Sequence, residues 1–169
     1  MTKMRFSTVF MAILVCVFVS ACSSSGTTEV STGKSQDIPP DRSVSLSIIA
    51  AAEENPTDVI QRLRGSLFER LVTEGVFGQV LHPHEAGDYR MDVVLGEVHE
   101  VSRHDRVLLG VLAGANTLEA TVSLHEVSTD RLVTAFHVSG SSASHPLASG
   151  NGMADAIREA VTQIILALQ

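Results

Sequence analysis

Apolar and polar residues alternate along several stretches of this chain. The alternation is clearest in Ser43–Ile48 and in Leu118–Val127. A period of two places every second side chain on the same face, so both stretches predict half-buried β-strands. The Ser-Thr-Asp sequence at 128–130 predicts a turn that returns the chain into a further strand. We expect the core-facing residues of that strand to be Leu132, Phe136 and Val138, with Thr134 among them.

Two other stretches have the 3.6-residue spacing of amphipathic helices. The first follows Asn55 and Pro56, which suit the cap and the first helical position, and it ends at Gly75. Its apolar stripe comprises Ile60, Leu63, Leu67 and Leu71. The second begins near Asn151 and runs to the end of the chain. Its apolar face comprises Ile157, Ala160, Val161, Ile164, Ile165 and Leu168.

The order of these elements predicts the fold class. A short strand at Val76–Leu81 and a long one at Tyr89–Val101 complete the order β-α-β-β-β-β-α. Such an order favours one α+β domain over residues 43–169, with a mixed or antiparallel sheet of about five strands. We expect the two helices to pack on one face of this sheet.

The amino terminus has the layout of an export signal. Lys3 and Arg5 precede an apolar run over Val9–Val19, which is about half the length of a bilayer span. The residues Val19-Ser20-Ala21-Cys22 resemble a bacterial lipobox. This resemblance implies that residues 1–21 are cleaved and that Cys22 is lipidated and acylated, for example with palmitate. The alternative is an ordinary secretory signal with a chance cysteine at its boundary.

The residue after the cysteine indicates a destination. Ser23 stands where inner-membrane lipoproteins carry an aspartate, so resemblance to Gram-negative lipoproteins implies the periplasmic face of the outer membrane. Two or more acyl chains anchor a protein stably. Residues 22–42 are rich in Ser, Thr and Gly and end at Pro39-Pro40. We expect them to form a flexible tether that holds the domain clear of the lipid surface.

Charge and cysteine content exclude several classes of function. The chain has 12 basic and 19 acidic residues, a net charge of −7. Loss of Lys3 and Arg5 with the signal leaves 10 basic and 19 acidic residues, a charge of −9, which argues against nucleic-acid binding. Of the two cysteines, Cys16 lies in the signal and Cys22 is the lipidation site. No disulfide framework or thiolate metal site is therefore expected.

Histidines are the main candidates for chemistry. His82-Pro83-His84-Glu85 places two imidazoles near a carboxylate, so a small-ligand or metal carrier that binds zinc or copper at His82 and His84 is an alternative function. A solvated loop is the simpler interpretation. His125 and His137 fall on the outward face of adjacent strands, where we expect them to be near neighbours that respond together to pH.

Enzymatic motifs are weak. Gly140–Ser144 lacks the closing glycine of a nucleophile elbow, and neither a Walker A lysine nor a dinucleotide glycine pattern occurs. An enzyme would have to bring Ser141, His137 and an acid together. We therefore expect a non-enzymatic protein without a cofactor.

The segment Val107–Ala115 is apolar and interrupted by glycines. It is typical of a strand or bend buried in the core, which is the interpretation that we favour. The alternative is an exposed patch for self-association, for a partner or for contact with a membrane. Its residues would be Leu108, Leu109, Val111 and Leu112.

From about Ser43 to Leu168 the chain resembles the bacterial lipoproteins of domain of unknown function 4410. The resemblance lies in the long strand from Tyr89, the glycine segment Arg106–Gly114, the hairpin Leu118–Val138 and the Gly-Ser loop before the last helix. The layout is more distantly similar to the periplasmic domains of CsgG and TolB. No catalytic residues come with these resemblances. The lipobox, the tether, the single domain and the lack of an assembled active site lead us to expect a membrane-anchored lipoprotein of the cell envelope. We expect its periplasmic domain to be an interaction or assembly module, with an envelope protein or a second copy as its partner.

Overall fold

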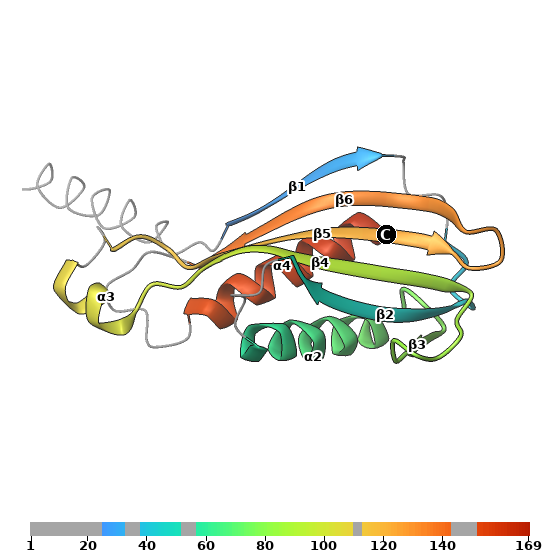
Figure 1. Ribbon diagram of the computed structural model, residues 1–169, viewed down its shortest axis with the longest axis horizontal. Coiled ribbons are helices and arrows are strands. Elements are labelled where there is room, and N and C mark those ends of the chain that lie inside the picture. Colours follow the sequence, from blue (N-terminus) through green and yellow to red (C-terminus); the bar gives the residue numbers. More distant parts are fainter. Residues whose placement is uncertain (1–24, 33–37, 52–56, 110–112, 143–151) are drawn as a thin grey trace, which may run out of the picture.

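The computed structural model describes residues 25–32, 38–51, 57–109, 113–142 and 152–169. The signal and Cys22 lie outside these ranges. The elements in chain order are β1 (Ser25–Thr32), β2 (Ser43–Ala50), α2 (Thr57–Thr73), β3 (Gln79–Leu81), β4 (Tyr89–His99), α3 (Arg103–Leu109), β5 (Thr117–Glu126), β6 (Arg131–Ser141) and α4 (Gly152–Leu168). The described strands form one sheet in the order β1-β6-β5-β4-β2-β3, with α2 and α4 alongside it (Figure 1).

The sheet is mixed, which is one of the two arrangements that the element order leaves open. β2 runs parallel to both β3 and β4, while β4, β5, β6 and β1 pair antiparallel in turn. The two long helices pack against each other and against the strands. The predicted single α+β domain is therefore confirmed. Among the described residues, no helix combines the length and the apolar character needed to cross a membrane.

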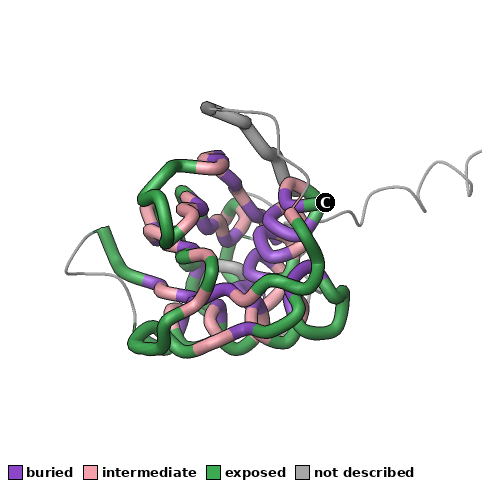
Figure 2. Tube along the Cα trace, turned by 90° about the vertical axis from the view of Figure 1, so that its right-hand side faces the viewer, coloured by how far each residue is buried: buried purple, intermediate pink, exposed green. Residues whose placement is uncertain are grey.

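The core lies between the sheet and the two long helices (Figure 2). The alternation predicted for β5 holds, because its inward residues are fully buried: Leu118, Ala120, Val122 and Leu124. The helix stripes face them, with Leu63, Leu67 and Leu71 from α2 and Ile157, Ala160 and Ile164 from α4.

Helix α4 approaches the sheet most closely at Gly140 of β6. A Cβ atom added there would collide with the backbone oxygen of Ala156 and lie 2.7 Å from the backbone nitrogen of Ala160. Glycine at position 140 therefore leaves room for the backbone of α4. Close packing against α4 therefore explains why a glycine stands at position 140.

The flexible tether expected over residues 22–42 is wrong for Ser25–Thr32, which form the edge strand β1. β1 pairs antiparallel with β6, from Ser25 opposite Ser141 to Thr32 opposite Ala135. An edge strand is held by backbone hydrogen bonds to one neighbour and needs no apolar alternation. Hydropathy therefore did not predict β1, because its sequence is polar: Ser-Gly-Thr-Thr-Glu-Val-Ser-Thr.

The expectation that Leu132 faces the core is also wrong. Its side chain is 39% exposed, whereas Thr134 is buried. The register of β5 and β6 shifts at this point, because Leu124 lies opposite Thr134 but His125 lies opposite Leu132. The extra residue in β6 turns Leu132 to the outer face of the sheet. Phe136 and Val138 are buried as predicted.

Candidate functional site

The exposed apolar residues of α3 are the first candidate site. Val107, Leu108 and Leu109 have 77%, 67% and 54% of their surface exposed. The favoured interpretation of this stretch as a buried strand or bend is therefore wrong for these residues. They lie in a short helix beyond the end of the sheet (Figure 1). Val111 and Leu112, the other members of the predicted patch, lie outside the described residues.

The start of α3 is stabilised by its own cap. The backbone nitrogen of Asp105 donates to the Ser102 hydroxyl at 3.1 Å, and that hydroxyl donates to the Asp105 carboxylate at 2.6 Å. This arrangement satisfies a backbone group that a helix start leaves unpaired. Local hydrogen bonds thus support the helix without burial of its last three apolar residues.

Buried hydrogen bonds close the base of the excursion that carries α3. The side-chain oxygen of Asn116 accepts from the backbone nitrogen of Val101 at 2.7 Å. The backbone nitrogen of Asn116 donates to the Ser142 hydroxyl at 3.0 Å, and the Ser142 nitrogen donates back to the Asn116 carbonyl at 2.9 Å. Asn116 and Ser142 are 3% and 4% exposed. Sequence analysis identified neither residue. The available signal was for Asn116, which is a polar residue directly before the alternating strand β5.

The loop of His82 and His84 forms a turn rather than an assembled metal centre. The Glu85 carboxylate accepts from the backbone nitrogen of His82 at 2.8 Å, and the Glu85 nitrogen donates to the His82 carbonyl at 3.0 Å. The His82 ring stacks on Phe68 of α2, with centroids 6.0 Å apart. They border a hollow of about 340 Å³ whose wall includes Arg64.

Within the described ranges, no three residues of the histidine, cysteine, aspartate or glutamate types come together in a way that could hold a metal ion. Zinc sites in proteins generally have three or four protein ligands. The predicted metal site at His82 and His84 therefore has no third ligand of these types in the described part of the chain, and it stays an untested prediction.

Ser141 and His137 lie on the same strand and do not form a nucleophile and base. They are four residues apart, which corresponds to about 13 Å along a strand. His137 instead lies opposite Thr121, with 3.4 Å between its Nδ1 and the threonine hydroxyl, and its Nε2 is 3.9 Å from the Glu119 carboxylate. A catalytic pair requires direct hydrogen-bond contact.

The expected proximity of His125 and His137 is also wrong. His137 pairs with Thr121, whereas His125 pairs with Leu132 at the other side of the register shift. Four residues of β5 therefore separate the two rings along the strand, about 13 Å. A joint response of the two imidazoles to pH is not supported by this geometry.

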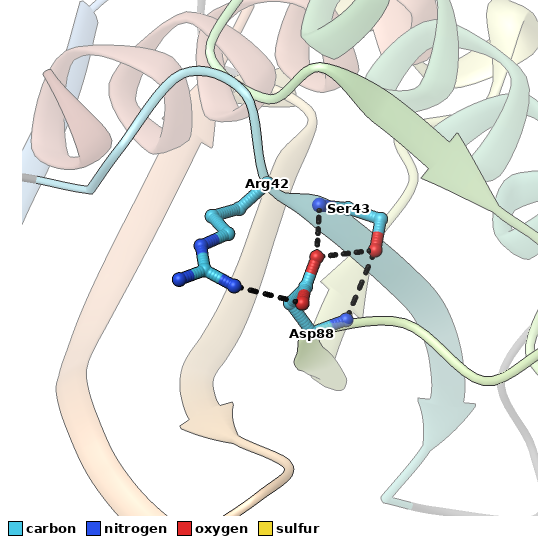
Figure 3. Close-up of polar contacts among 3 residues, drawn as sticks. All are labelled: Arg42, Ser43 and Asp88. Atoms are coloured by element: carbon cyan, nitrogen blue, oxygen red, sulfur yellow. Dashed lines mark hydrogen bonds and ion pairs between the residues drawn. The ribbon is translucent and has the colours of Figure 1, made fainter.

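A polar cluster missed by sequence analysis joins the start of β2 to the start of β4 (Figure 3). The Asp88 carboxylate accepts from the Ser43 backbone nitrogen at 2.9 Å and from its hydroxyl at 2.8 Å, and it pairs with Arg42 at 3.1 Å. These hydrogen bonds from Ser43, followed by that from Arg42, lower the pKa of Asp88.

The Asp88 cluster borders a second hollow of about 290 Å³, whose far side is formed by Glu126 and the following turn. The hydrogen bond from the Thr129 hydroxyl, at 2.7 Å, is the main cause that lowers the pKa of Glu126, and Arg131 adds to it. Both carboxylates are thus held in the ionised form by neighbours. The hydrogen bonds of the Asp88 carboxylate thus join the start of β2 to the start of β4.

The fold has relatives among solved structures. The PelC dodecamer from Paraburkholderia phytofirmans superposes with a TM-score of 0.60 at 17% identity, over 86% of this chain and 98% of PelC, and a point variant of PelC gives the same values. A candidate lipoprotein from Caulobacter crescentus CB15 is 22% identical over 73% of this chain and 86% of its own, with a TM-score of 0.39, which is too low to carry an argument.

No curated protein matches the chain. The family described as domain of unknown function DUF4410 matches residues 26–146, which is more than half of the 169 residues. The match begins inside β1 and ends just beyond β6, so it includes the edge strand and the excursion that carries α3. The chain therefore belongs to the DUF4410 family.

Proposed function

We propose that this chain is a non-enzymatic lipoprotein of the bacterial cell envelope that is anchored by lipid on Cys22 and assembles with copies of itself. The anchor holds it at the periplasmic face of the outer membrane. One observation carries the assembly half of the proposal: the chain superposes over 98% of PelC, a protein solved as a dodecamer. The more distant likeness to CsgG and TolB stays a prediction of the sequence.

The anchor half of the proposal depends on the lipobox resemblance at Val19–Cys22. A positively charged start and a short apolar run precede it, as an exported lipoprotein requires. The mature chain would then begin three residues before β1.

The outer face of the sheet is a surface suited to a neighbouring copy. Both long helices lie on the other face, and no described element covers this one. The middle of the outer face is formed by small or hydroxyl-bearing residues of β5 and β6, among them Thr121, Ser123, Ala135 and Ser139. A two-layer domain leaves room for a third layer here, which a second copy would supply.

An ion pair and a histidine–carboxylate contact within the chain lie on this face. Arg90 lies 3.0 Å from Asp92, and His137 lies 3.9 Å from Glu119. A neighbour that covers the face would therefore bury Arg90 and Asp92 as a neutralised pair, which costs much less than burial of an isolated charge. This supports the outer face as the contact between copies.

The proposal is tested in intact cells. The wild-type chain should incorporate labelled palmitate, remain in the outer-membrane fraction and give crosslinked multimers of itself. The matched control, Cys22→Ser, should lose both the label and the membrane fraction. Wild-type chain that carries no label would refute the anchor, and wild-type chain that yields only monomer after crosslinking would refute the assembly.

A further inference from the structure

The three exposed apolar residues of α3 are unusual in their arrangement as well as their exposure. Val107, Leu108 and Leu109 are consecutive at the end of the helix. Consecutive residues of an α-helix point about 100° apart, so these side chains spread around the helix instead of forming one stripe. A protein groove would contact one stripe, whereas a fluid apolar medium contacts all sides of a helix tip.

The sheet register places the start of β1 at the same end of the molecule as α3. Ser25 lies opposite Ser141 of β6, Ser141 lies opposite Thr117 of β5, and Thr117 lies opposite His99 of β4. α3 belongs to the connection between His99 and Thr117. Figure 1 shows the start of β1 and α3 toward the same end of the long axis.

Only a short length of chain separates this end from the predicted lipid. Cys22 precedes Ser25 by three residues, which span at most about 10 Å even when fully extended. Because residues 25–32 form a strand rather than a tether, the domain begins close to its anchor. The sheet end that carries α3 must then lie close to the bilayer.

We propose that α3 is a second membrane contact, in which Val107, Leu108 and Leu109 insert into the phospholipid bilayer that holds the lipid of Cys22. This inference rests on the proposed anchor. The anchor keeps α3 at a high local concentration near lipid, so a contact of three side chains is populated although it would be weak alone. The helix tip thus sets the orientation of the domain on the membrane.

A bilayer fits these residues better than a second copy. A specific interface buries about 800 Å² on each partner, which three side chains at a helix tip do not provide. Insertion into lipid needs no complementary shape. Hydrogen bonds of the buried Asn116 with Val101 and Ser142 hold the base of the excursion at the end of the sheet.

The test uses the lack of tryptophan in this chain, which makes one introduced tryptophan a unique fluorescent reporter. Leu108→Trp places it in α3. The matched control is Val127→Trp, because Val127 is 48% exposed and follows β5 at the opposite end of the sheet. Both lipidated full-length mature chains are reconstituted into vesicles of phosphatidylethanolamine and phosphatidylglycerol, with and without brominated acyl chains. Flotation with the vesicles measures anchoring separately.

If α3 enters the bilayer, Leu108→Trp emission shifts to the blue and is quenched by the brominated chains, while Val127→Trp shows neither effect. Emission from Leu108→Trp that stays water-like and unquenched in floating protein overturns the inference and leaves the anchor intact. A blue shift without quenching also overturns it, because a second copy then covers α3. Failure of the wild-type chain to float overturns the proposed anchor itself.

Discussion

Asp88 and Ser43 hold each other by hydrogen bonds in both directions. The Ser43 hydroxyl donates to the Asp88 carboxylate at 2.8 Å and accepts from the Asp88 backbone nitrogen at 3.0 Å. The two residues directly precede the first pair of the parallel β2–β4 ladder, Val44 opposite Tyr89. They therefore set the register of two strands that are separated by α2 and β3 in the sequence.

This contact predicts a pH dependence of stability. The folded-state pKa of Asp88 lies below its ordinary value of 3.8, so the folded chain releases this proton more readily than the unfolded chain. The stabilisation is complete well above pH 3.8 and is lost as the pH falls from there through the folded-state pKa. Thermal unfolding of wild type and Asp88→Asn should differ at neutral pH and converge in acid.

Ser43→Ala is the control for this experiment. It removes the hydroxyl donor but keeps the backbone donor to Asp88, so its melting temperature at neutral pH should lie between those of wild type and Asp88→Asn. A gap between wild type and Asp88→Asn that widens as the pH falls would contradict the sign of the shift.

Gly140→Ala should destabilise the domain. The new methyl group would collide with the backbone of α4 at Ala156 and Ala160, and overpacking of this kind costs about 1–3 kcal/mol. Gly65→Ala is the matched control, because nothing lies within 4 Å of its added Cβ on the exposed side of α2. Alanine in a helix interior is about 0.5–1 kcal/mol more favourable than glycine. Denaturant unfolding should thus show opposite signs for the two variants.

Asn116→Ala should weaken the base of the α3 excursion. It leaves the buried backbone nitrogen of Val101 without its 2.7 Å acceptor, a loss of about 1–3 kcal/mol. Hydrogen exchange should report faster exchange at the Val101 amide in particular. Gln79→Ala, which removes an exposed amide from β3, should change stability by less than about 0.5 kcal/mol. Unchanged protection at Val101 would show that Asn116 does not hold this base.

Ser123→Arg should disrupt the assembly of copies without unfolding the domain. Ser123 lies in the middle of the outer face, opposite Asp92 on one side and Ala135 on the other. An arginine there would place a long charged side chain where a neighbour packs. Ser128→Arg, in the exposed turn at the end of β5, carries the same charge and should leave the multimer intact. Size-exclusion chromatography with light scattering distinguishes the two results.

Hydropathy predicted the parts of this fold that apolar burial determines. The strand that carries Leu118 and Leu124 and the helices that carry Leu67 and Ile164 were identified because their buried positions repeat with the period of the element. The order of these elements predicted one sheet, mixed or antiparallel, with the helices on one face.

Elements held by local or backbone hydrogen bonds were not predictable in the same way. β1 pairs through its backbone at a sheet edge, and α3 is supported by the Ser102 cap while its apolar residues stay exposed. An apolar stretch such as Val107–Leu109 is normally buried, so sequence alone favoured the wrong environment for it. The Ser43–Asp88 contact joins residues 45 positions apart and had no local signature.

The stoichiometry of the mature chain tests the central proposal most directly. Native mass spectrometry of the protein extracted from membranes in detergent measures the lipid on Cys22 and the number of copies together. The account predicts a closed multimer in which each copy begins at residue 22 and carries the mass of its acyl chains. A mass that corresponds to a single copy at every concentration, or to copies without lipid, would contradict it.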